Sequence, residues 1–383
     1  MSSDRTRDLE RWVPRLIAVW RRARRRPGGP DDRLTPPELR EVAAGVRRLS
    51  LGLTRERELA GARYMDDPAL LGAYLLFYWP VSYAQAREAL GELRRPRSVL
   101  DLGSGPGPLA FAALDAGAAE ATCADRSKAA LALARELATE AEEALAIREW
   151  DPQRTAALPD GTYDVVTLGH VLNELFPGAE GIERRAALCE RALGQVKPGG
   201  SLLMLEPALR DTSRDLLAVR DRLVEHGFSV RAPCLFRGPC PALTKPGDWC
   251  HAERLWRMPR LVEDLARAAS LHKEALKMSY LAVAPKGDPV PALPLGRLFR
   301  IVSEPLEGKG RARYVGCGPE GRGGLALQEK HRSDANAAFF SLRRGDVIRI
   351  GETEERGDGQ ALTERSEVTV IAPAGVAVPK LEQ

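Results

Sequence analysis

The spacing of apolar and polar positions changes twice along the chain and divides it into three parts. Up to residue 95 the apolar residues recur at helical spacing, as at Leu9, Trp12, Leu16 and Trp20. From residue 97 to about 230, short apolar runs alternate with helical patterns, which is typical of a doubly wound α/β sheet. Beyond residue 297 the pattern predicts only short strands with turn signals between them, as in a small barrel or sandwich.

These patterns predict three regions, namely a helical domain at 1–95, an α/β domain at 96–285 and a small β domain at 286–383. A helix is expected over 127–146 because its apolar residues keep a helical period. A segment rich in proline and glycine at 232–256 interrupts the α/β pattern. We therefore expect the last two strands of the sheet only after it, at 274–277 and 279–284.

A glycine-rich turn follows the first apolar strand of the α/β part, in the run Asp101-Leu-Gly-Ser-Gly-Pro-Gly107. Glycines permit positive φ and a close approach of the backbone to a ligand. A dinucleotide-binding turn needs the pattern G-x-G-x-x-G, but Pro108 stands where its third glycine belongs. The pattern D-x-G-x-G-x-G instead resembles motif I of the S-adenosylmethionine methyltransferases, which implies their class I, Rossmann-like α/β fold.

A second strand ends at Asp125, about 20 residues after the glycines, where an acid can accept both ribose hydroxyls of a nucleoside. Further on, Trp150 could stack on adenine and Asp151 could accept from its amino group, although a core tryptophan and a helix-capping aspartate fit the pattern equally well. The expected cofactor-binding residues are Asp101, Gly103, Ser104, Gly105, Gly107, Asp125, Arg126, Trp150 and Asp151.

The fourth strand, 163–170, is expected to end close to the reactive methyl group, because ligands of such sheets bind at the carboxyl ends of the strands. His170, Asn173 and Glu174 are therefore the candidate catalytic residues. Asn173 and Glu174 could equally cap the next helix. The Asn-Pro-Pro-Tyr signature for methylating exocyclic base nitrogens does not occur here.

Positive charge is concentrated at the N-terminus. The whole chain carries a net charge of +4, whereas residues 1–30 contain nine arginines and three acidic residues. This excess favours an anionic partner such as RNA, and a solubilising helix face or a basic arm is the alternative. The sequence contains neither an apolar run near the ~18 residues of a membrane helix nor a signal-peptide core, so we expect a cytoplasmic protein.

Three of the six cysteines, Cys234, Cys240 and Cys250, lie within 17 residues of the interrupting segment. A disulfide would be reduced in the cytoplasm, so the cluster predicts a metal or redox site. Its spacing lacks the C-x2-C pair of an ordinary zinc finger. Cys317 is a better fourth ligand than His251, which adjoins Cys250, and four thiolates suit an iron–sulfur cluster or tetrahedral zinc.

The cysteine elements, together with Asn173-Glu174-Leu175 and Glu206-Pro207, resemble the ribosomal small-subunit assembly family that includes methyltransferase-like protein 17 and its yeast and bacterial relatives. The resemblance implies a [4Fe-4S] cluster on Cys234, Cys240, Cys250 and Cys317, S-adenosylmethionine at the glycine turn, and action on the rRNA of the small ribosomal subunit during its assembly. Two alternatives stay open, a non-catalytic rRNA-binding assembly factor and a zinc-containing RNA methyltransferase. We expect a monomer when the protein is free.

Overall fold

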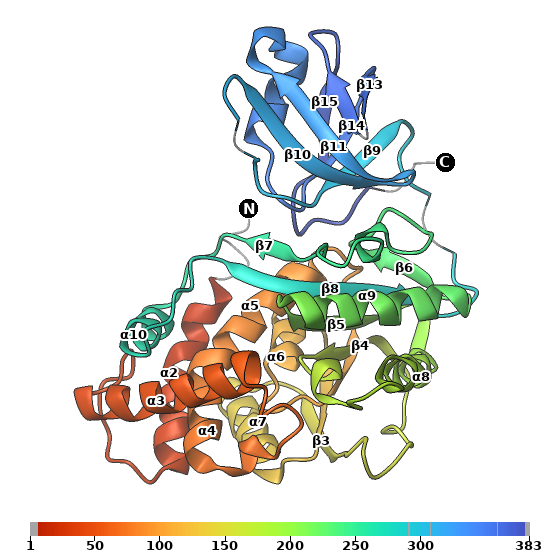
Figure 1. Ribbon diagram of the computed structural model, residues 1–383. Helices are drawn as coiled ribbons and strands as arrows, with labels where there is room; N and C mark the ends of the chain where they lie inside the picture. The colour runs from red at the N-terminus through yellow and green to blue at the C-terminus, as the bar shows by residue number, and fades with distance from the viewer. Residues whose placement is uncertain (1–6, 290–291, 307, 358, 380–383) are drawn as a thin grey trace.

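The computed structural model describes residues 7–289, 292–306, 308–357 and 359–379. They form an α/β body, with helices on both faces of a large sheet, and a β barrel that lies beyond one edge of that sheet (Figure 1). Within these ranges no helix is both long enough and apolar enough to cross a membrane.

The large sheet has the strand order β3-β2-β1-β4-β5-β8-β6, and β7 also pairs with β8. Strands β1 to β5 are parallel to one another, whereas β8 is antiparallel to its neighbours. The order reverses at β1 and β4, which confirms the expected Rossmann-like fold and places a ligand crevice at their carboxyl ends. The strands are β1 (Ser98–Leu102), β2 (Glu120–Asp125), β3 (Leu145–Glu149), β4 (Tyr163–Gly169), β5 (Val196–Pro207), β6 (Ser229–Ala232), β7 (Ala252–Arg254) and β8 (Leu276–Ala284).

Two details of the expected α/β pattern are wrong. The sixth strand, β6, precedes the cysteine-rich segment, and the residues at 274–284 supply the single strand β8. The helix expected over 127–146 ends earlier, as α7 (Lys128–Ala141), because Glu142 adopts a left-handed conformation with φ 56°. Residues 145–149 then form the edge strand β3.

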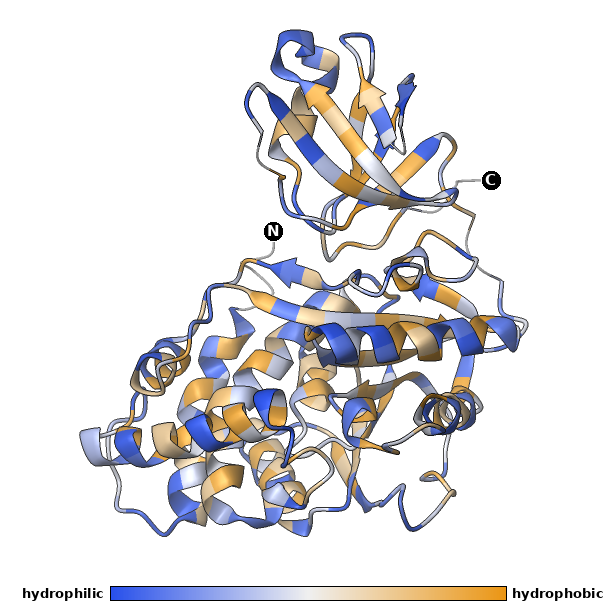
Figure 2. Ribbon diagram, viewed as in Figure 1, coloured by the Kyte–Doolittle hydropathy of each residue, from blue (hydrophilic) through white to orange (hydrophobic). Residues whose placement is uncertain are grey.

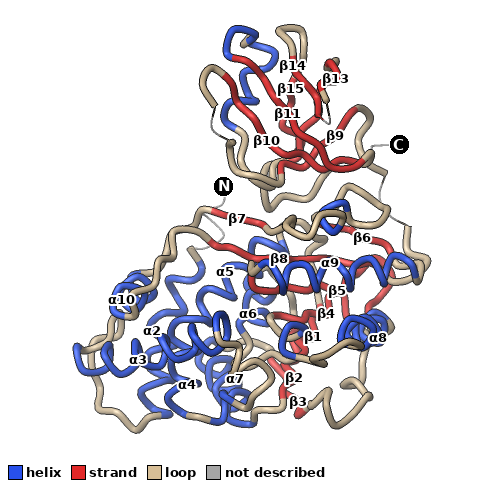
Figure 3. The backbone as a smooth tube through the Cα atoms, in the orientation of Figure 1, coloured by secondary structure: helices blue, strands red, loops and turns tan. Residues whose placement is uncertain are grey.

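The N-terminal helices share one apolar core with a face of the sheet. This core joins Trp12 and Trp79 to Phe111 of α6 and Leu203 of β5. The region therefore packs as a layer on the sheet, next to α6 and α7 (Figure 3). Its elements, with α6, are α2 (Asp8–Ala23), α3 (Pro36–Ser50), η1 (Leu51–Arg55), η2 (Tyr64–Asp66), α4 (Pro68–Ala73), η3 (Tyr74–Tyr78), α5 (Trp79–Leu90) and α6 (Pro108–Asp115).

Helices α8 (Gly181–Leu193) and α9 (Arg210–Glu225) cover the opposite face of the sheet with a second apolar core. Leu216, Val219 and Leu223 of α9 are buried, whereas the hydrophilic side of this helix faces outward (Figure 2). Short 3-10 turns lie near the strand ends, and α10 follows β7. These elements are η4 (Leu172–Glu174), η5 (Pro241–Leu243) and α10 (Arg260–Ala268).

The C-terminal region is the expected small β structure, with the strand order β13-β14-β11-β10-β9-β12-β15 and its own apolar core. Leu235 of the cysteine-rich segment packs against Leu298 and Val347 of this region. The barrel elements are β9 (Arg297–Ile301), β10 (Arg311–Gly318), β11 (Gly321–Gln328), η6 (Glu329–His331), η7 (Asp334–Ser341), β12 (Val347–Ile350), β13 (Glu354–Arg356), β14 (Gly359–Leu362) and β15 (Val368–Ala372).

Candidate functional site

The glycine turn between β1 and α6 has the open backbone that the sequence predicts. Gly103, Gly105 and Gly107 all have positive φ, at 68°, 52° and 80°. A Cβ on Gly103 would lie 2.4 Å from the Val171 side chain, and one on Gly105 would lie 2.9 Å from Met65 Cε. Only glycine fits these positions without strain. The turn is largely buried, with Gly103 partly exposed at the carboxyl end of β1.

The two aspartates beside the turn have different surroundings. Asp101 lies beneath the turn, where it accepts hydrogen bonds from Thr167 Oγ1 at 2.6 Å and the Ala110 amide at 3.3 Å. Burial raises the pKa of Asp101 to about 7. Asp125, at the end of β2, accepts from the amides of Gly105 at 2.8 Å and Ser127 at 2.7 Å. Asp125 therefore connects β2 to the glycine turn through hydrogen bonds, and its carboxylate oxygens can each accept a further hydrogen bond.

A pocket opens at the carboxyl ends of β1, β2 and β4, with a volume of about 80 Å³. Of the predicted site residues, it brings together Gly103, Asp125, Arg126, Trp150, Asp151, His170 and Glu174. Asp101, Ser104, Gly105, Gly107 and Asn173 do not line it. Trp150 is 5% exposed and donates from Nε1 to the Ala157 carbonyl oxygen, so its indole is fixed at the wall.

A segment that the sequence reasoning did not single out crosses this pocket. We call residues 57–66 the covering segment. Arg126 Nη2 donates to the carbonyl oxygens of Gly61 at 3.0 Å and Ala62 at 2.5 Å. From the same segment, Arg57 donates to Asn173 Oδ1 at 2.8 Å. These contacts join groups distant in the sequence, and no local pattern could have revealed them.

The candidate catalytic side chains are held by neighbours from the N-terminal helices and the covering segment. His170 has a positive φ of 59° and shares a 3.0 Å hydrogen bond between its Nε2 and Gln85 Oε1. Gln85 donates its amide to the Lys277 carbonyl oxygen, so its Oε1 is the acceptor and His170 Nε2 carries the proton. Burial lowers the pKa of His170 to about 4, which keeps the ring neutral at pH 7.

Glu174 is half-buried at the pocket wall. It accepts from the Gly61 amide and from the Tyr64 hydroxyl, each at 3.3 Å. Burial raises the pKa of Glu174 to about 7, so the carboxyl group can release or accept a proton near neutral pH.

Glu206 at the end of β5 is a buried acid that we did not predict as a site residue. Its Oε1 accepts from the Leu172 amide at 2.9 Å, whereas its Oε2 has no hydrogen-bond partner in the described part of the chain. Burial raises the pKa of Glu206 to about 8. Its position on the strand next to β4 was the signal that could have identified it.

The four predicted metal ligands come from separate places in the fold. Cys234 follows β6, Cys240 precedes η5, Cys250 precedes β7 and Cys317 lies on β10 of the barrel. Burial raises the pKa of Cys317 to about 12, and the nearby thiols of Cys234, Cys250 and Cys240 contribute to this shift. Cys317 is therefore in the same part of the fold as the other three thiols.

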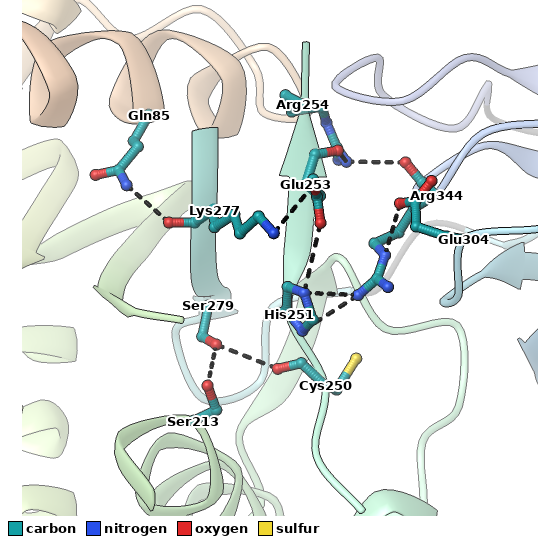
Figure 4. Close-up of polar contacts among 10 residues, drawn as sticks. All are labelled: Gln85, Ser213, Cys250, His251, Glu253, Arg254, Lys277, Ser279, Glu304 and Arg344. Atoms are coloured by element: carbon teal, nitrogen blue, oxygen red, sulfur yellow. Dashed lines mark hydrogen bonds and ion pairs between the residues drawn. The ribbon is translucent and has the colours of Figure 1, made fainter. Parts of the chain in front are cut away.

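A second pocket is lined by Cys234 and Cys250, together with Arg300 and Arg344 of the barrel. His251 is stacked on Trp249 with ring centroids 4.2 Å apart, and it interacts with the Arg344 guanidinium (Figure 4). Across the described ranges, no group of three or more histidine, cysteine or acidic side chains is arranged to hold a metal ion.

Many of the N-terminal arginines form ion pairs inside the protein. Arg21 contacts Glu38 at 2.9 Å with both side chains buried, and Arg22 contacts Glu136 of α7 at 2.5 Å. Arg11, Arg24 and Arg26 also contact acidic side chains. Much of the positive charge of α2 is therefore balanced by acids of neighbouring helices, as expected for a helix face that docks on the body.

A protein-family model matches most of the chain. The model of the family described as mitochondrial small ribosomal subunit Rsm22 matches residues 70–349, which is more than two thirds of the chain. A search of curated proteins finds no match.

Similar solved structures include three methyltransferases. An O-methyltransferase family protein from Burkholderia thailandensis is 17% identical over 67% of this chain and 76% of that chain, with a TM-score of 0.39. The ribosomal protein L11 methylase from Lactobacillus delbrueckii subsp. bulgaricus is 16% identical over 54% and 78%, with a TM-score of 0.32. A methyltransferase from Pyrococcus furiosus is 19% identical over 39% and 73%, also with a TM-score of 0.32. The match over residues 70–349 shows that this chain belongs to the Rsm22 family.

Proposed function

We propose that this protein binds S-adenosylmethionine in the pocket beside the glycine turn and acts on the small ribosomal subunit during its assembly. The observation that carries the cofactor assignment is the positive-φ turn, next to Asp125, at the point where the sheet reverses its strand order. Family membership supports the ribosomal partner. The cytoplasmic location expected from the sequence is part of this proposal.

The residues around the pocket fit an adenosyl cofactor in their chemistry. Asp125 offers free lone pairs to a ribose diol, Trp150 offers an aromatic wall to a base, and Asp151 can accept from an amino group. Met65 of the covering segment lines this pocket and lies close to Gly105, so a molecule that approaches the glycine turn would displace its side chain.

S-adenosylmethionine supplies an electrophilic methyl group when it is bound. Glu174 is the residue best suited to take a proton from a nucleophile, because its pKa lies near neutrality and it lines the pocket. Gln85 holds the neutral ring of His170 in one tautomer at the same wall. Most of the rate enhancement would come from orienting the acceptor in line with the methyl group.

One observation favours a second function, that of a non-catalytic rRNA-binding factor. The side chains of Asn173 and Glu174 both accept hydrogen bonds from the covering segment, so both have a structural role without any methyl acceptor. In this function the cofactor pocket would stabilise the fold or sense the cofactor. Purified immature small subunits and tritiated cofactor distinguish the two. Label transferred to rRNA supports the enzyme, whereas tight cofactor binding without label supports the binding factor.

We further propose a [4Fe-4S] cluster on Cys234, Cys240, Cys250 and Cys317. Four cysteines are the usual ligands of such a cluster. Its support is the resemblance of the cysteine elements to the assembly family, together with two observations. Cys234 and Cys250 line the same pocket, and the thiols of Cys234, Cys250 and Cys240 contribute to the raised pKa of Cys317.

Metal analysis after anaerobic purification tests the cluster. Four iron and four sulfide per chain with visible absorbance would support it, whereas a colourless protein with stoichiometric zinc would contradict it. Cys317→Ser should reduce the iron content, while Cys123→Ser, on β2, serves as the control and should retain it. Full iron in Cys317→Ser would point to His251 as the fourth ligand.

A further inference from the structure

The strand connections of the C-terminal barrel follow the OB plan. β9, β10 and β11 form an antiparallel meander, and η7 then leads to β12, which returns to pair with β9. After it, β14 pairs in parallel with β11, and β15 pairs with β12. In OB folds the outer face of the second and third strands, with the neighbouring loops, binds oligonucleotides or oligosaccharides. The equivalent face here belongs to β10 and β11.

The strand register shows which side chains lie on that face. Tyr314 and Leu325 point into the barrel core, so Arg311, Arg313 and Val315 of β10 lie on the outer side. The residues paired with these three are Gln328, Ala326 and Gly324 of β11. In the next strand, Gly359 and Ala361 pair with Gly324 and Ala326. The outer face therefore has a floor of small residues, bordered on one side by arginines.

A hollow of about 870 Å³ lies over this floor. Leu306 from the β9–β10 loop lines one part of it, and Arg356 from β13 and Arg365 from the turn before β15 line another. Its four arginines, at 311, 313, 356 and 365, outnumber its two acids, Glu354 and Glu364. The hollow is thus cationic and is framed by the loops that OB folds use for their ligands.

We propose that this outer face of the barrel binds a single strand of RNA, with its phosphates at the arginines and its bases over the small-residue floor. Arg311 and Arg313 are two residues apart on a strand, about 7 Å, which matches the spacing of neighbouring phosphates along an extended strand. The lining has no exposed phenylalanine, tyrosine or tryptophan, since Tyr314 is 2% exposed, although it includes the imidazole of His331. Base stacking therefore contributes little, and binding depends weakly on sequence. Only the source of the RNA, the small ribosomal subunit, rests on the proposed function.

Fluorescence anisotropy with a labelled 12-nucleotide uridine RNA and the full-length protein tests this surface. Arg311→Gln with Arg356→Gln should weaken binding about tenfold at 0.1 M salt and reduce the salt slope by about 1.4, since each lost phosphate contact contributes about 0.7 on single strands. The control pair, Arg343→Gln with Arg349→Gln, removes two exposed arginines outside the hollow and should change affinity less than twofold.

A substitution in the floor provides an independent test. A Cβ added at Gly324 would meet no atom within 4 Å, and the residue is exposed, so a side chain there can extend into solvent. Gly324→Glu should weaken RNA binding by repelling phosphates, whereas Gly324→Lys should retain or strengthen it. The proposal would be overturned if both arginine double variants lost RNA affinity equally, or if Glu and Lys at position 324 changed the affinity equally. It would also be overturned if a duplex RNA competed as well as the single strand. The assay contains no methyl donor, so a failure of the cofactor assignment leaves its outcome unchanged.

Discussion

Asp125 links two parts of the cofactor pocket, because its carboxylate holds the Gly105 amide and lies at the pocket wall. Asp125→Asn keeps the size of the side chain and removes its charge. A hydrogen bond to a charged group contributes about 1.5–3 kcal/mol, so S-adenosylmethionine should bind at least tenfold more weakly in isothermal titration calorimetry. Glu149→Gln, an exposed acid at the end of β3, is the control and should bind normally. Equal affinity of both variants would remove Asp125 from the site.

The buried acid Glu206 should make stability depend on pH. Its pKa in the folded protein is about 8, well above the usual value, so the folded state keeps a proton that the unfolded state has already released. Stability is therefore greatest below about pH 4.5 for this group and falls as the pH rises through 8, by up to about 1.4 kcal/mol per pH unit for one proton.

Urea unfolding at pH 5.5 and 8.5 measures this effect. Glu206→Gln cannot ionise and should lose less stability than the unmodified protein between these two pH values. Glu174, with a pKa of about 7, also makes the folded state less stable as the pH rises. The Glu206→Gln variant should therefore still lose some stability between the two pH values, but less than the unmodified protein. An identical pH dependence with and without Glu206→Gln would show that Glu206 is ionised in the folded state.

At the level of elements, Arg126 donates two of the hydrogen bonds that attach the covering segment to the body, and Arg57 and Tyr64 donate others. Arg126→Ala removes both hydrogen bonds to the backbone of the segment and should speed amide hydrogen exchange across residues 57–66, since exposed loops with few buried contacts open readily. Arg148→Ala on β3 is the control, because its guanidinium bonds only the neighbouring Ile147 carbonyl oxygen. Unchanged exchange in Arg126→Ala would mean that the contacts of Met65 and Tyr64 hold the segment in place.

Elements built from local signals could be predicted, and elements built from distant contacts could not. The strand, glycine turn and Asp125 follow from spacing within about 30 residues, and the structure places them together. Strand β6 was missed because its only partner, β8, lies beyond the cysteine-rich segment. The end of α7 was missed because Glu142, and no glycine, takes the left-handed position.

The charge of the N-terminal region also depends on contacts between residues that are distant in the sequence. Nine arginines in the first 30 residues favour an RNA contact when they are read alone. The acids that pair with them, such as Glu38 and Glu136, belong to other helices, so the balance is visible only in three dimensions. In the barrel, the sequence is nearly neutral overall, but the structure places several arginines around one hollow.

For the whole molecule, a buried ion pair joins the barrel to the body. Glu92, just after α5, accepts from Arg300 of β9 at 2.9 and 3.1 Å and from the Tyr280 hydroxyl. Both side chains of the pair are at least 93% buried. Glu92→Ala would leave the Arg300 charge unpaired, which typically costs about 3–5 kcal/mol. We expect a lower melting temperature and faster proteolysis of the linker near residue 288.

Glu304→Ala is the control for this interface, because Glu304 pairs with Arg344 at the exposed rim and surface pairs contribute about 0–1 kcal/mol. Glu92→Leu combined with Arg300→Leu should recover part of the lost stability, since it leaves no charge buried. If the Glu92→Ala and Glu304→Ala variants have the same melting temperature, the barrel is held on the body chiefly by the apolar packing around Leu235.

Cys317, the fourth ligand of the proposed cluster, lies on β10, whereas the other three proposed ligands lie in the insertion of the α/β body. During translation, the body and these three sulfurs leave the ribosome before Cys317 is added. In the proposed cluster, a complete set of ligands can therefore form only after the barrel has emerged, folded and docked. Iron bound by a purified sample would then measure the fraction of chains that have folded through β10.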